Sequence, residues 1–400
     1  MGDRRAELVE RLAELAVDGG ANVQPGQIVS VGTEPGKELL ARAIAVAAYR
    51  RGAKFVDVSS FDLHVKHARV KYAREEDLSF VPPWYGERVR ALGEHHAARV
   101  GLTGPSAPGL FADLDPARLA RDPLPFLREG VEVVNRMLTN WTAVPCPTPA
   151  WAALVHGDGD DALDRLWEDI ARVCRLDEPD PSAAWRARAK QLGSTAARLT
   201  GLKLRSLRFR GGDTDLRVGL LEGSRWLGGS LETSWGLVHV PNLPTEEVFT
   251  TPDPEQVEGF VRSTKPLVIG GTTVRGLCVR FEGGRAVEVT ADEGGDVLEA
   301  MLRRDEGAAR LGEVALVDRE SRVGQLDTVF YDTLLDENAA SHIALGSAYS
   351  AAVEGPSAER ANDSEIHVDF MIGDSDVEVT GVTADGTEIG VMSGGAWQLP

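Results

Sequence analysis

The pattern of hydrophobic residues changes half-way along this chain of 400 residues, and that change limits the folds open to it. Up to about residue 135, short apolar runs typical of buried strands alternate with longer segments whose apolar residues recur at helical spacing. This alternation favours an open, mostly parallel sheet with helices on both faces. Beyond about residue 200, short strand-like runs separated by paired glycines replace it.

The expected elements can be given by residue range. Helices are expected at 4–16, 37–51, 82–92, 162–175 and 182–199, with mixed helical periodicity at 123–137. Strands are expected at 27–32, 54–58, 98–102, 204–209, 216–221, 267–269 and 274–281. We therefore expect an N-terminal α/β domain with a helical transition segment over residues 1–200, and a C-terminal strand-rich α+β domain over residues 201–400.

Length and charge narrow the possible functions. A chain of 43.0 kDa exceeds what one hydrophobic core usually serves, which agrees with two domains. The formal net charge of −19 repels the phosphates of nucleic acids and anionic lipids. No apolar run approaches the roughly 20 residues that span a bilayer, and the N-terminus leads into a charged amphipathic helix without a signal sequence. We expect a cytoplasmic protein that binds neither nucleic acid nor membrane.

Acidic and imidazole side chains gather in the last quarter of the chain, within segments otherwise built of small or apolar residues. They are Glu313, Glu337, His342, His367 and Asp369, with Tyr349 among them. Carboxylates and imidazoles are the usual ligands of Zn²⁺, Mn²⁺ and Co²⁺, and a site for two divalent ions needs several carboxylates to balance their charge. These residue types together suggest a metal-dependent hydrolase.

The segment 364–373 alternates strictly between polar and apolar residues. Because successive side chains of a strand point to opposite faces, His367 and Asp369 share one face, and Val368 and Phe370 can pack into the core. Such packing would hold the polar pair rigid. Taken alone, the same pattern also fits an amphipathic edge strand whose polar face meets water.

The segment 336–349 is rich in small residues, and we expect it to form a turn that opens a helix. On that helix His342 and Tyr349, seven residues apart, would lie on one face, so that Tyr349 could reach back toward His342. Glu337 is expected on the turn before the helix. A core histidine whose hydrogen bonds are satisfied is the alternative interpretation of His342.

Further acidic residues adjoin apolar strands. Glu313 lies at the edge of the apolar segment 311–317, where a buried carboxylate would be costly without a partner and a metal ion would offset that penalty. Glu246 and Glu247 lie between a proline turn and an apolar pair, a pattern that also fits an exposed loop.

Four ordered motifs give the chain a close resemblance to the aminopeptidase T family of metallo-aminopeptidases. The motifs are 244–250 (PTEEVFT), Gly312–Glu313, 336–349 and 367–373 (HVDFMIG), and the resemblance covers nearly the whole chain. It implies a cytoplasmic homodimer that holds two divalent ions per chain, Zn, Co or Mn, in a C-terminal catalytic domain. The family's metal ligands fall on Glu247, Glu313, Glu337, His342, His367 and Asp369, and its active-site tyrosine falls on Tyr349.

That set of residues implies hydrolysis of the N-terminal residue of a peptide with a free amine. The four carboxylates balance the charge of two divalent ions, and a water held between the ions has a lowered pKa and can attack the peptide carbonyl. Glu313 is expected to bridge the ions. Tyr349 could donate a hydrogen bond to the tetrahedral oxyanion, and Glu246 could shuttle a proton or receive the α-ammonium.

Two alternatives stay open: a metal-dependent amidase or deacylase that acts on a non-peptide amide, and a non-catalytic homologue with a structural metal site. Structural sites are closed, which agrees less well with an oriented tyrosine. A nucleotide-binding loop at 32–38 is not indicated, because the glycine spacing is too short and Glu38 stands where Ser or Thr would meet Mg²⁺.

Overall fold

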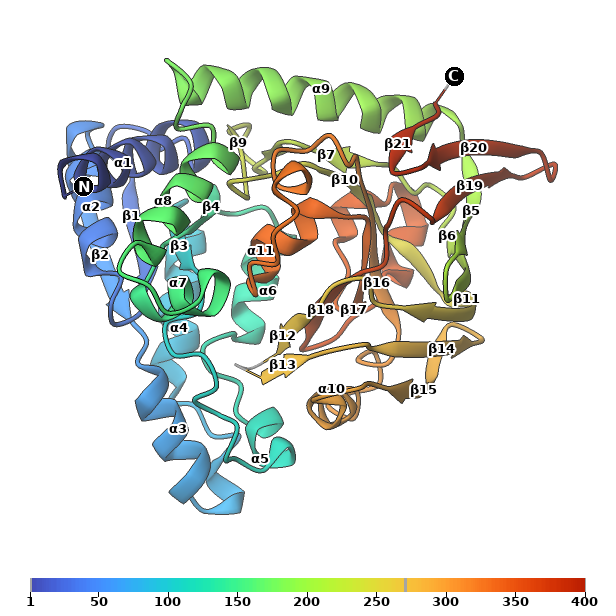
Figure 1. The fold of residues 1–400 in the computed structure, drawn as a ribbon, viewed down its shortest axis with the longest axis horizontal. Coiled ribbons are helices and arrows are strands. Elements are labelled where there is room, and N and C mark those ends of the chain that lie inside the picture. The colour runs from blue at the N-terminus through green and yellow to red at the C-terminus, as the bar shows by residue number, and fades with distance from the viewer. Residues whose placement is uncertain (1, 270–271, 400) are drawn as a thin grey trace. The chain divides into compact units, whose positions relative to one another are not determined.

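The structure is a computed structural model that describes residues 2–269 and 272–399 of the chain (Figure 1). The chain divides into two compact units. The first comprises residues up to Lys190 together with Gly229–Thr245, and the second comprises Gln191–Gly228 together with the chain from Glu246 onward. A segment from the second half of the chain thus belongs to the first unit. The assignment of residues 1–200 and 201–400 to an N-terminal and a catalytic domain stays a prediction.

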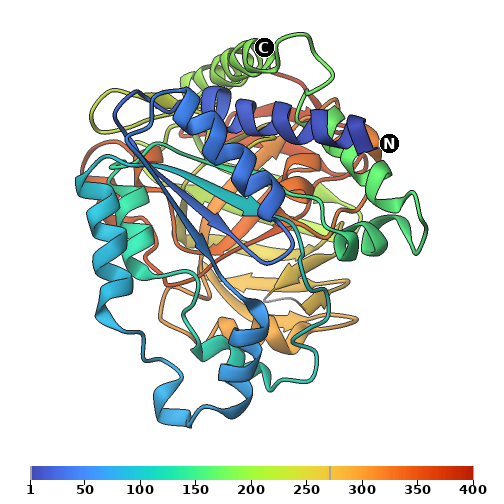
Figure 2. The same cartoon turned by 90° about the vertical axis from the view of Figure 1, so that its left-hand side faces the viewer.

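A four-stranded parallel sheet organises the first unit. The strand order is β2-β1-β3-β4, with β1 at Ile28–Thr33, β2 at Phe55–Ser60, β3 at Ala98–Thr103 and β4 at Trp141–Pro145. Figure 2 shows α1 (Gly2–Leu15) packed against α2 (Glu38–Arg50). The strands are joined by helices, as the alternating periodicity predicts, and the expected mixed α/β fold is confirmed.

The other elements of the first unit are shorter. Its further helices are α3 (Leu63–Tyr72), α4 (Pro83–Glu94), α5 (Pro116–Arg121), α6 (Arg128–Asn135), α7 (Pro149–His156) and α8 (Ala162–Val173). A small hairpin is formed by β8 (Leu231–Glu232) and β9 (Val238–His239). The long helix α9 (Pro181–Gly201) begins in the first unit and ends in the second. Within the described part of the chain, no helix combines the length and the apolarity needed to cross a membrane.

Two antiparallel sheets build the second unit. The larger has the strand order β15-β14-β11-β6-β5-β19-β20-β21, and the smaller has the order β18-β17-β16-β10-β7. The strands of the larger sheet are β5 (Leu204–Gly211), β6 (Thr214–Leu220), β11 (Pro252–Arg262), β14 (Cys278–Glu282), β15 (Arg285–Thr290), β19 (Glu378–Thr383), β20 (Glu388–Ser393) and β21 (Ala396–Trp397). Those of the smaller sheet are β7 (Leu227–Gly228), β10 (Glu247–Thr250), β16 (Leu311–Val317), β17 (His342–Gly346) and β18 (His367–Met371).

Further short elements also belong to the second unit. They are the hairpin of β12 (Leu267–Ile269) and β13 (Thr272–Val274), and the helices α10 (Gly295–Met301) and α11 (Thr333–Asp336). The single strand expected at 274–281 is wrong, since β13 ends at Val274 and β14 begins only at Cys278.

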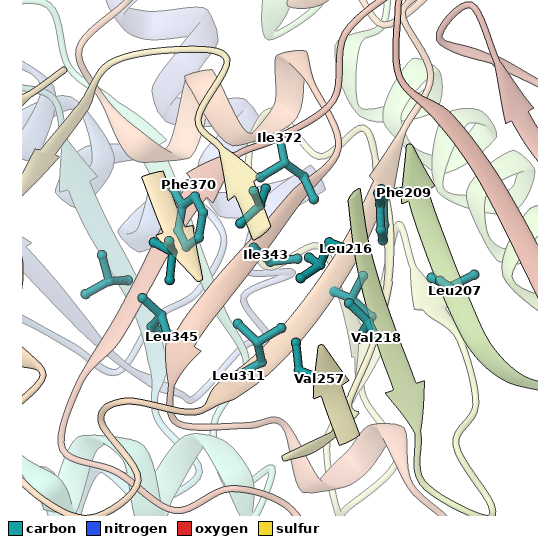
Figure 3. Close-up of a cluster of buried hydrophobic side chains, with 14 of the residues drawn as sticks. Leu207, Phe209, Leu216, Val218, Val257, Leu311, Ile343, Leu345, Phe370 and Ile372 are labelled. Atoms are coloured by element: carbon teal, nitrogen blue, oxygen red, sulfur yellow. The ribbon is translucent and has the colours of Figure 1, made fainter. Parts of the chain in front are cut away.

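The hydrophobic core of the second unit lies between its two sheets (Figure 3). The larger sheet contributes Leu207, Phe209, Leu216, Val218 and Val257. The smaller sheet contributes Leu311, Ile343, Leu345 and Phe370. Each such side chain contributes about 1.5–3 kcal/mol when it is fully removed from water, so this face fixes the smaller sheet firmly in place.

The opposite face of the smaller sheet is polar. Because strand residues alternate between faces, the neighbours of the core residues project to the other side. This second face carries Glu247, Glu313, His342, His367 and Asp369. One face of the smaller sheet thus packs in the hydrophobic core, and the other carries the polar side chains of the candidate site.

The helix expected after residue 336 is wrong. The chain makes short turns in α11 and in the 3₁₀ turn η4 (Glu337–Ala339), and His342 then begins a strand. Residues 342–346 alternate between the ligand-bearing face and the core, and β17 pairs with a strand on each side. This pairing outweighs the helix propensity of the alanines nearby. His342 and Tyr349 therefore share no helix face.

Candidate metal centre

The polar face of the smaller sheet brings together residues that are far apart in the sequence. Glu247 begins β10, Glu313 lies on β16, His342 begins β17, His367 and Asp369 lie on β18, and Glu337 opens the turn η4 before β17. Strand register explains one close approach. Asp369 and Glu313 both pair with Ala344 from opposite sides, so two carboxylates flank one small side chain.

The ligand atoms of these side chains form three overlapping groups, within each of which the atoms lie no more than 4.8 Å apart. The groups are Glu247 with Glu313 and His342, Glu313 with His367 and Asp369, and Glu337 with His342 and Asp369. All six residues expected as ligands take part. Since Glu313, His342 and Asp369 each belong to two groups, the six side chains form one continuous cluster.

Backbone carbonyls orient both histidines. Nδ1 of His342 lies 3.2 Å from the carbonyl oxygen of Ala340, and Nδ1 of His367 lies 2.8 Å from that of Ser347. A carbonyl only accepts hydrogen bonds, so each Nδ1 carries a proton and donates it. This leaves each Nε2 as the ligand atom, which is how proteins usually fix a histidine at a metal.

Both Nε2 atoms face carboxylates. Nε2 of His342 lies 3.0 Å from Oε2 of Glu247. Nε2 of His367 lies 3.3 Å from Oε2 of Glu313 and 3.3 Å from Oδ1 of Asp369. Each imidazole therefore directs its Nε2 into a pocket of carboxylate oxygens.

Burial and the crowding of charges shift the pKa values of the cluster. Burial, joined by the charges of Asp369 and Glu247, raises the pKa of Glu337 well above its usual value. Burial likewise raises the pKa of Glu313. Burial opposes a charge on His342, but its contact with Glu247 and the nearby carboxylates outweigh this effect and raise the pKa of His342 to about 10. The cluster thus attracts positive charge strongly.

The cluster opens to solvent beside His367. The side chain of His342 is only 1 % exposed, whereas that of His367 is 27 % exposed. Burial disfavours charge on both members of the pair, yet Asp369 raises the pKa of His367 well above its usual value and His367 lowers that of Asp369. The exposed part of His367 thus gives solvent access to the cluster.

The donor set fits divalent metal ions. Oε2 of Glu247 is buried and makes no hydrogen bond, although Nε2 of His342 lies 3.0 Å away. A buried carboxylate oxygen without a hydrogen bond is costly, and a metal ion would satisfy it. The four carboxylates together would neutralise more than one such ion, and carboxylate and imidazole ligands suit Zn²⁺, Co²⁺ and Mn²⁺.

Tyr349 lies beside His367, not beside His342. The rings of Tyr349 and His367 meet edge to face with centroids 5.5 Å apart, and the ring of Phe249 lies 5.4 Å from that of Tyr349. The hydroxyl of Thr251 donates a hydrogen bond of 2.8 Å to the backbone carbonyl of Tyr349. Burial raises the pKa of the Tyr349 phenol, so the phenol stays protonated and can donate.

Glu246 is buried immediately before β10 and belongs to none of the three ligand groups. Its backbone N–H donates to Oδ1 of Asn338 at 2.5 Å, and Nδ2 of Asn338 donates to the carbonyl of Leu334 at 2.8 Å. Asn338 follows Glu337 directly. Its amide therefore ties the start of β10 to the turn that carries Glu337.

Several contributors to the cluster were not identified from the sequence. Asn338 lies inside one of the four motifs, and its position beside Glu337 is the signal that could have revealed its role. The carbonyls of Ala340 and Ser347 have no sequence signal, because every residue carries a backbone acceptor.

Comparisons with known proteins agree with this geometry. A family model described as thermophilic metalloprotease (M29) matches residues 5–397. Aminopeptidase T of Thermus thermophilus is 43 % identical, with 97 % of this chain and 98 % of that protein covered. Aminopeptidase 2 of Geobacillus stearothermophilus is 38 % identical, with 97 % of each covered. The solved structure of wild-type AmpT from Thermus thermophilus matches with a TM-score of 0.88 at 40 % identity, with 100 % of both chains covered. The resemblance inferred from the four motifs is thereby confirmed, and the chain belongs to the M29 family of thermophilic metalloproteases.

Proposed function

We propose that this chain is a metallo-aminopeptidase that removes the N-terminal residue from peptides. The observation that carries the proposal is the cluster of carboxylates and imidazoles on one face of the smaller sheet, with both Nε2 atoms directed at carboxylate oxygens. The relatives that cover nearly the whole chain are named aminopeptidases, which supports this choice among metalloproteases.

Two divalent ions per chain, Zn, Co or Mn, are part of the proposal. His342 and His367 belong to no common ligand group, which supports an assignment of the two histidines to two different ions. His367 would hold one ion together with Glu313 and Asp369. His342, which shares one ligand group with Glu247 and another with Glu337, would hold the other ion. Glu313 and Asp369 each belong to two of the ligand groups, so both suit the bridging position that the sequence assigned to Glu313 alone.

The bound ions would supply the Lewis acidity that activates a water molecule and polarises the scissile carbonyl. Residues of the chain supply the hydrogen bonds and the proton acceptor that the reaction also needs. Tyr349 would donate its phenol hydrogen bond to the oxygen on which negative charge develops. Glu246 would accept a proton or the α-ammonium of the peptide. The net charge of −19 of the whole chain favours a substrate that carries an α-ammonium.

We propose that residues 201–400 form the catalytic domain and that the chain acts in the cytoplasm as a homodimer, with peptides as its partners in place of nucleic acid or membrane. The net charge of −19 supports the exclusion of polyanions.

The deciding experiment compares free and blocked N-termini. Metal-free protein is reconstituted with Co²⁺, Zn²⁺ or Mn²⁺ and is given one peptide in free-amine and N-acetylated forms. We expect release of the N-terminal amino acid from the free peptide only. Cleavage of the acetylated form alone would replace the proposal with an amidase or deacylase, and bound metal without any cleavage would indicate a structural site.

A further inference from the structure

The strand that carries Glu313 contains a β-bulge beside the ligand cluster. Leu311 pairs with Leu345 of β17, whereas Glu313 pairs with Ala344, the next residue along β17. Gly312 is therefore the extra residue of β16 and has no partner of its own in this ladder.

The bulge changes the face to which Glu313 points. In an unbroken strand, residues two apart point to the same face. Leu311 packs in the core with Leu345, so without the extra residue Glu313 would also point into the core between the two sheets. With the bulge, Glu313 lies in register with Ala344 and Asp369 on the ligand-bearing face.

Only glycine leaves enough room at position 312. A Cβ atom there would lie 2.3 Å from the carbonyl oxygen of Ser347 and 2.4 Å from that of Gly346. Both are backbone atoms that cannot rotate away. The backbone of Gly312 is not left-handed, so the constraint comes from this close approach and not from its torsion angles.

The carbonyl that a side chain at 312 would displace also orients a second candidate ligand. The oxygen of Ser347 accepts the hydrogen bond from Nδ1 of His367 at 2.8 Å. Glu313 and His367 belong to one ligand group with Asp369, whereas His342 is oriented by Ala340 in a different segment. Gly312 thus lies directly before Glu313 and close to the carbonyl that orients His367, and these two residues belong to the same ligand group.

We infer that Gly312 is a positioning residue of the metal centre. Its bulge directs Glu313 to the ligand-bearing face, and its missing side chain lets the Ser347 carbonyl orient His367. The inference rests on the proposed function, because it takes these residues as metal ligands.

The test compares Gly312→Ala with Gly390→Ala as a matched control. Gly390 lies on β20 of the same unit, and a Cβ there would meet only Gln398, at an ordinary contact distance of 3.8 Å. Each full-length protein is freed of metal and titrated with Co²⁺. Bound Co²⁺ per chain, its visible absorption spectrum and the unfolding temperature with and without Co²⁺ are measured, with Glu313→Gln as the reference for loss of a ligand.

We expect Gly390→Ala to match the wild type in all three measurements. Gly312→Ala should fold without metal but bind Co²⁺ at least about tenfold more weakly, as is usual when a partner of a ligand is disturbed. Its visible spectrum should change, and added Co²⁺ should raise its unfolding temperature less than that of the wild type, as for Glu313→Gln.

Three results would overturn the inference. Co²⁺ binding and spectrum equal to those of the wild type would show that Gly312 does not position ligands. Failure of metal-free Gly312→Ala to fold would show that the glycine serves the sheet packing itself. A wild-type protein that binds no Co²⁺ would overturn the proposed function as well, which distinguishes that failure from the first two.

Discussion

The two histidines show how single residues acquire a defined role from their neighbours. His342 is almost fully buried, so its backbone acceptor and the adjacent Glu247 decide which nitrogen carries a proton. The sequence identified His342 and His367 as candidates through their residue types and motifs. It could not identify the acceptor carbonyls, because every residue carries one and the Ser347 carbonyl reaches His367 only after β17 and β18 have paired.

Loss of one candidate ligand should remove metal as well as activity. We expect His342→Ala and Glu313→Gln to lower bound metal per chain, and to lower kcat/KM by more than the roughly 10- to 100-fold that loss of an outer partner costs. Elemental analysis of the folded variants measures the metal. A variant that keeps its full metal content would contradict the ligand role of that residue.

Tyr349→Phe should separate metal binding from turnover. The substitution keeps the ring that contacts Phe249 and His367 and removes only the phenol donor. We expect unchanged metal content and a kcat lower by about 10²–10³-fold, the usual effect of losing one donor to an oxyanion. Steady-state kinetics on the metal-loaded variant give the answer, and an unchanged kcat would exclude Tyr349 as that donor.

The neighbouring strands β17 and β18 could not be predicted equally well from the sequence. The segment of β18 alternates large apolar residues with polar ones, so the shared face of His367 and Asp369 follows from the sequence alone. The segment of β17 has small residues at alternate positions, which leaves the period weak and favours a helix in isolation. Its strand state depends on pairing with β16 and β18, which lie apart from it in the sequence.

Ala344, the small residue in the middle of β17, leaves space beside two candidate ligands. Ala344 lies between Glu313 and Asp369, and a larger side chain there would occupy the space between the two carboxylates. We expect Ala344→Val to weaken Co²⁺ binding clearly while destabilising the fold by no more than about 1–3 kcal/mol. Ala344→Gly keeps the space open and should retain Co²⁺ binding. Equal Co²⁺ affinities in the two variants, measured by titration, would contradict this role.

At the scale of the whole molecule, the alternating periodicity was sufficient to predict the parallel α/β sheet. It did not reveal that Gly229–Thr245 belongs to the first unit. That segment is held by contacts with residues distant in sequence, such as the hydrogen bond between His239 and the carbonyl of Trp141, and such contacts have no local pattern.

His239 should make stability depend on pH. It is 2 % exposed, and burial lowers its pKa from an ordinary value of 6.5 to about 4. Because the folded-state pKa lies below the unfolded one, this burial contributes its full stability above about pH 6.5 and loses it as the pH falls toward 4. Between pH 7.5 and 4.5 we expect it to reduce the free energy of unfolding by about 2–3 kcal/mol.

Urea unfolding of the wild type and of His239→Gln across this range measures the effect. The free energy of unfolding of the wild type should fall more steeply with decreasing pH than that of the variant, by the stated amount. Parallel curves for the two proteins would show that His239 does not carry this dependence.

The most direct test of the metal centre is anomalous X-ray diffraction from crystals equilibrated with Co²⁺ or Zn²⁺. We expect anomalous peaks about 2.0–2.1 Å from Nε2 of His342 and from Nε2 of His367, with Glu313 or Asp369 contacting both ions. Peaks elsewhere on the chain and none at this cluster, from protein that cleaves free-amine peptides, would contradict this expectation.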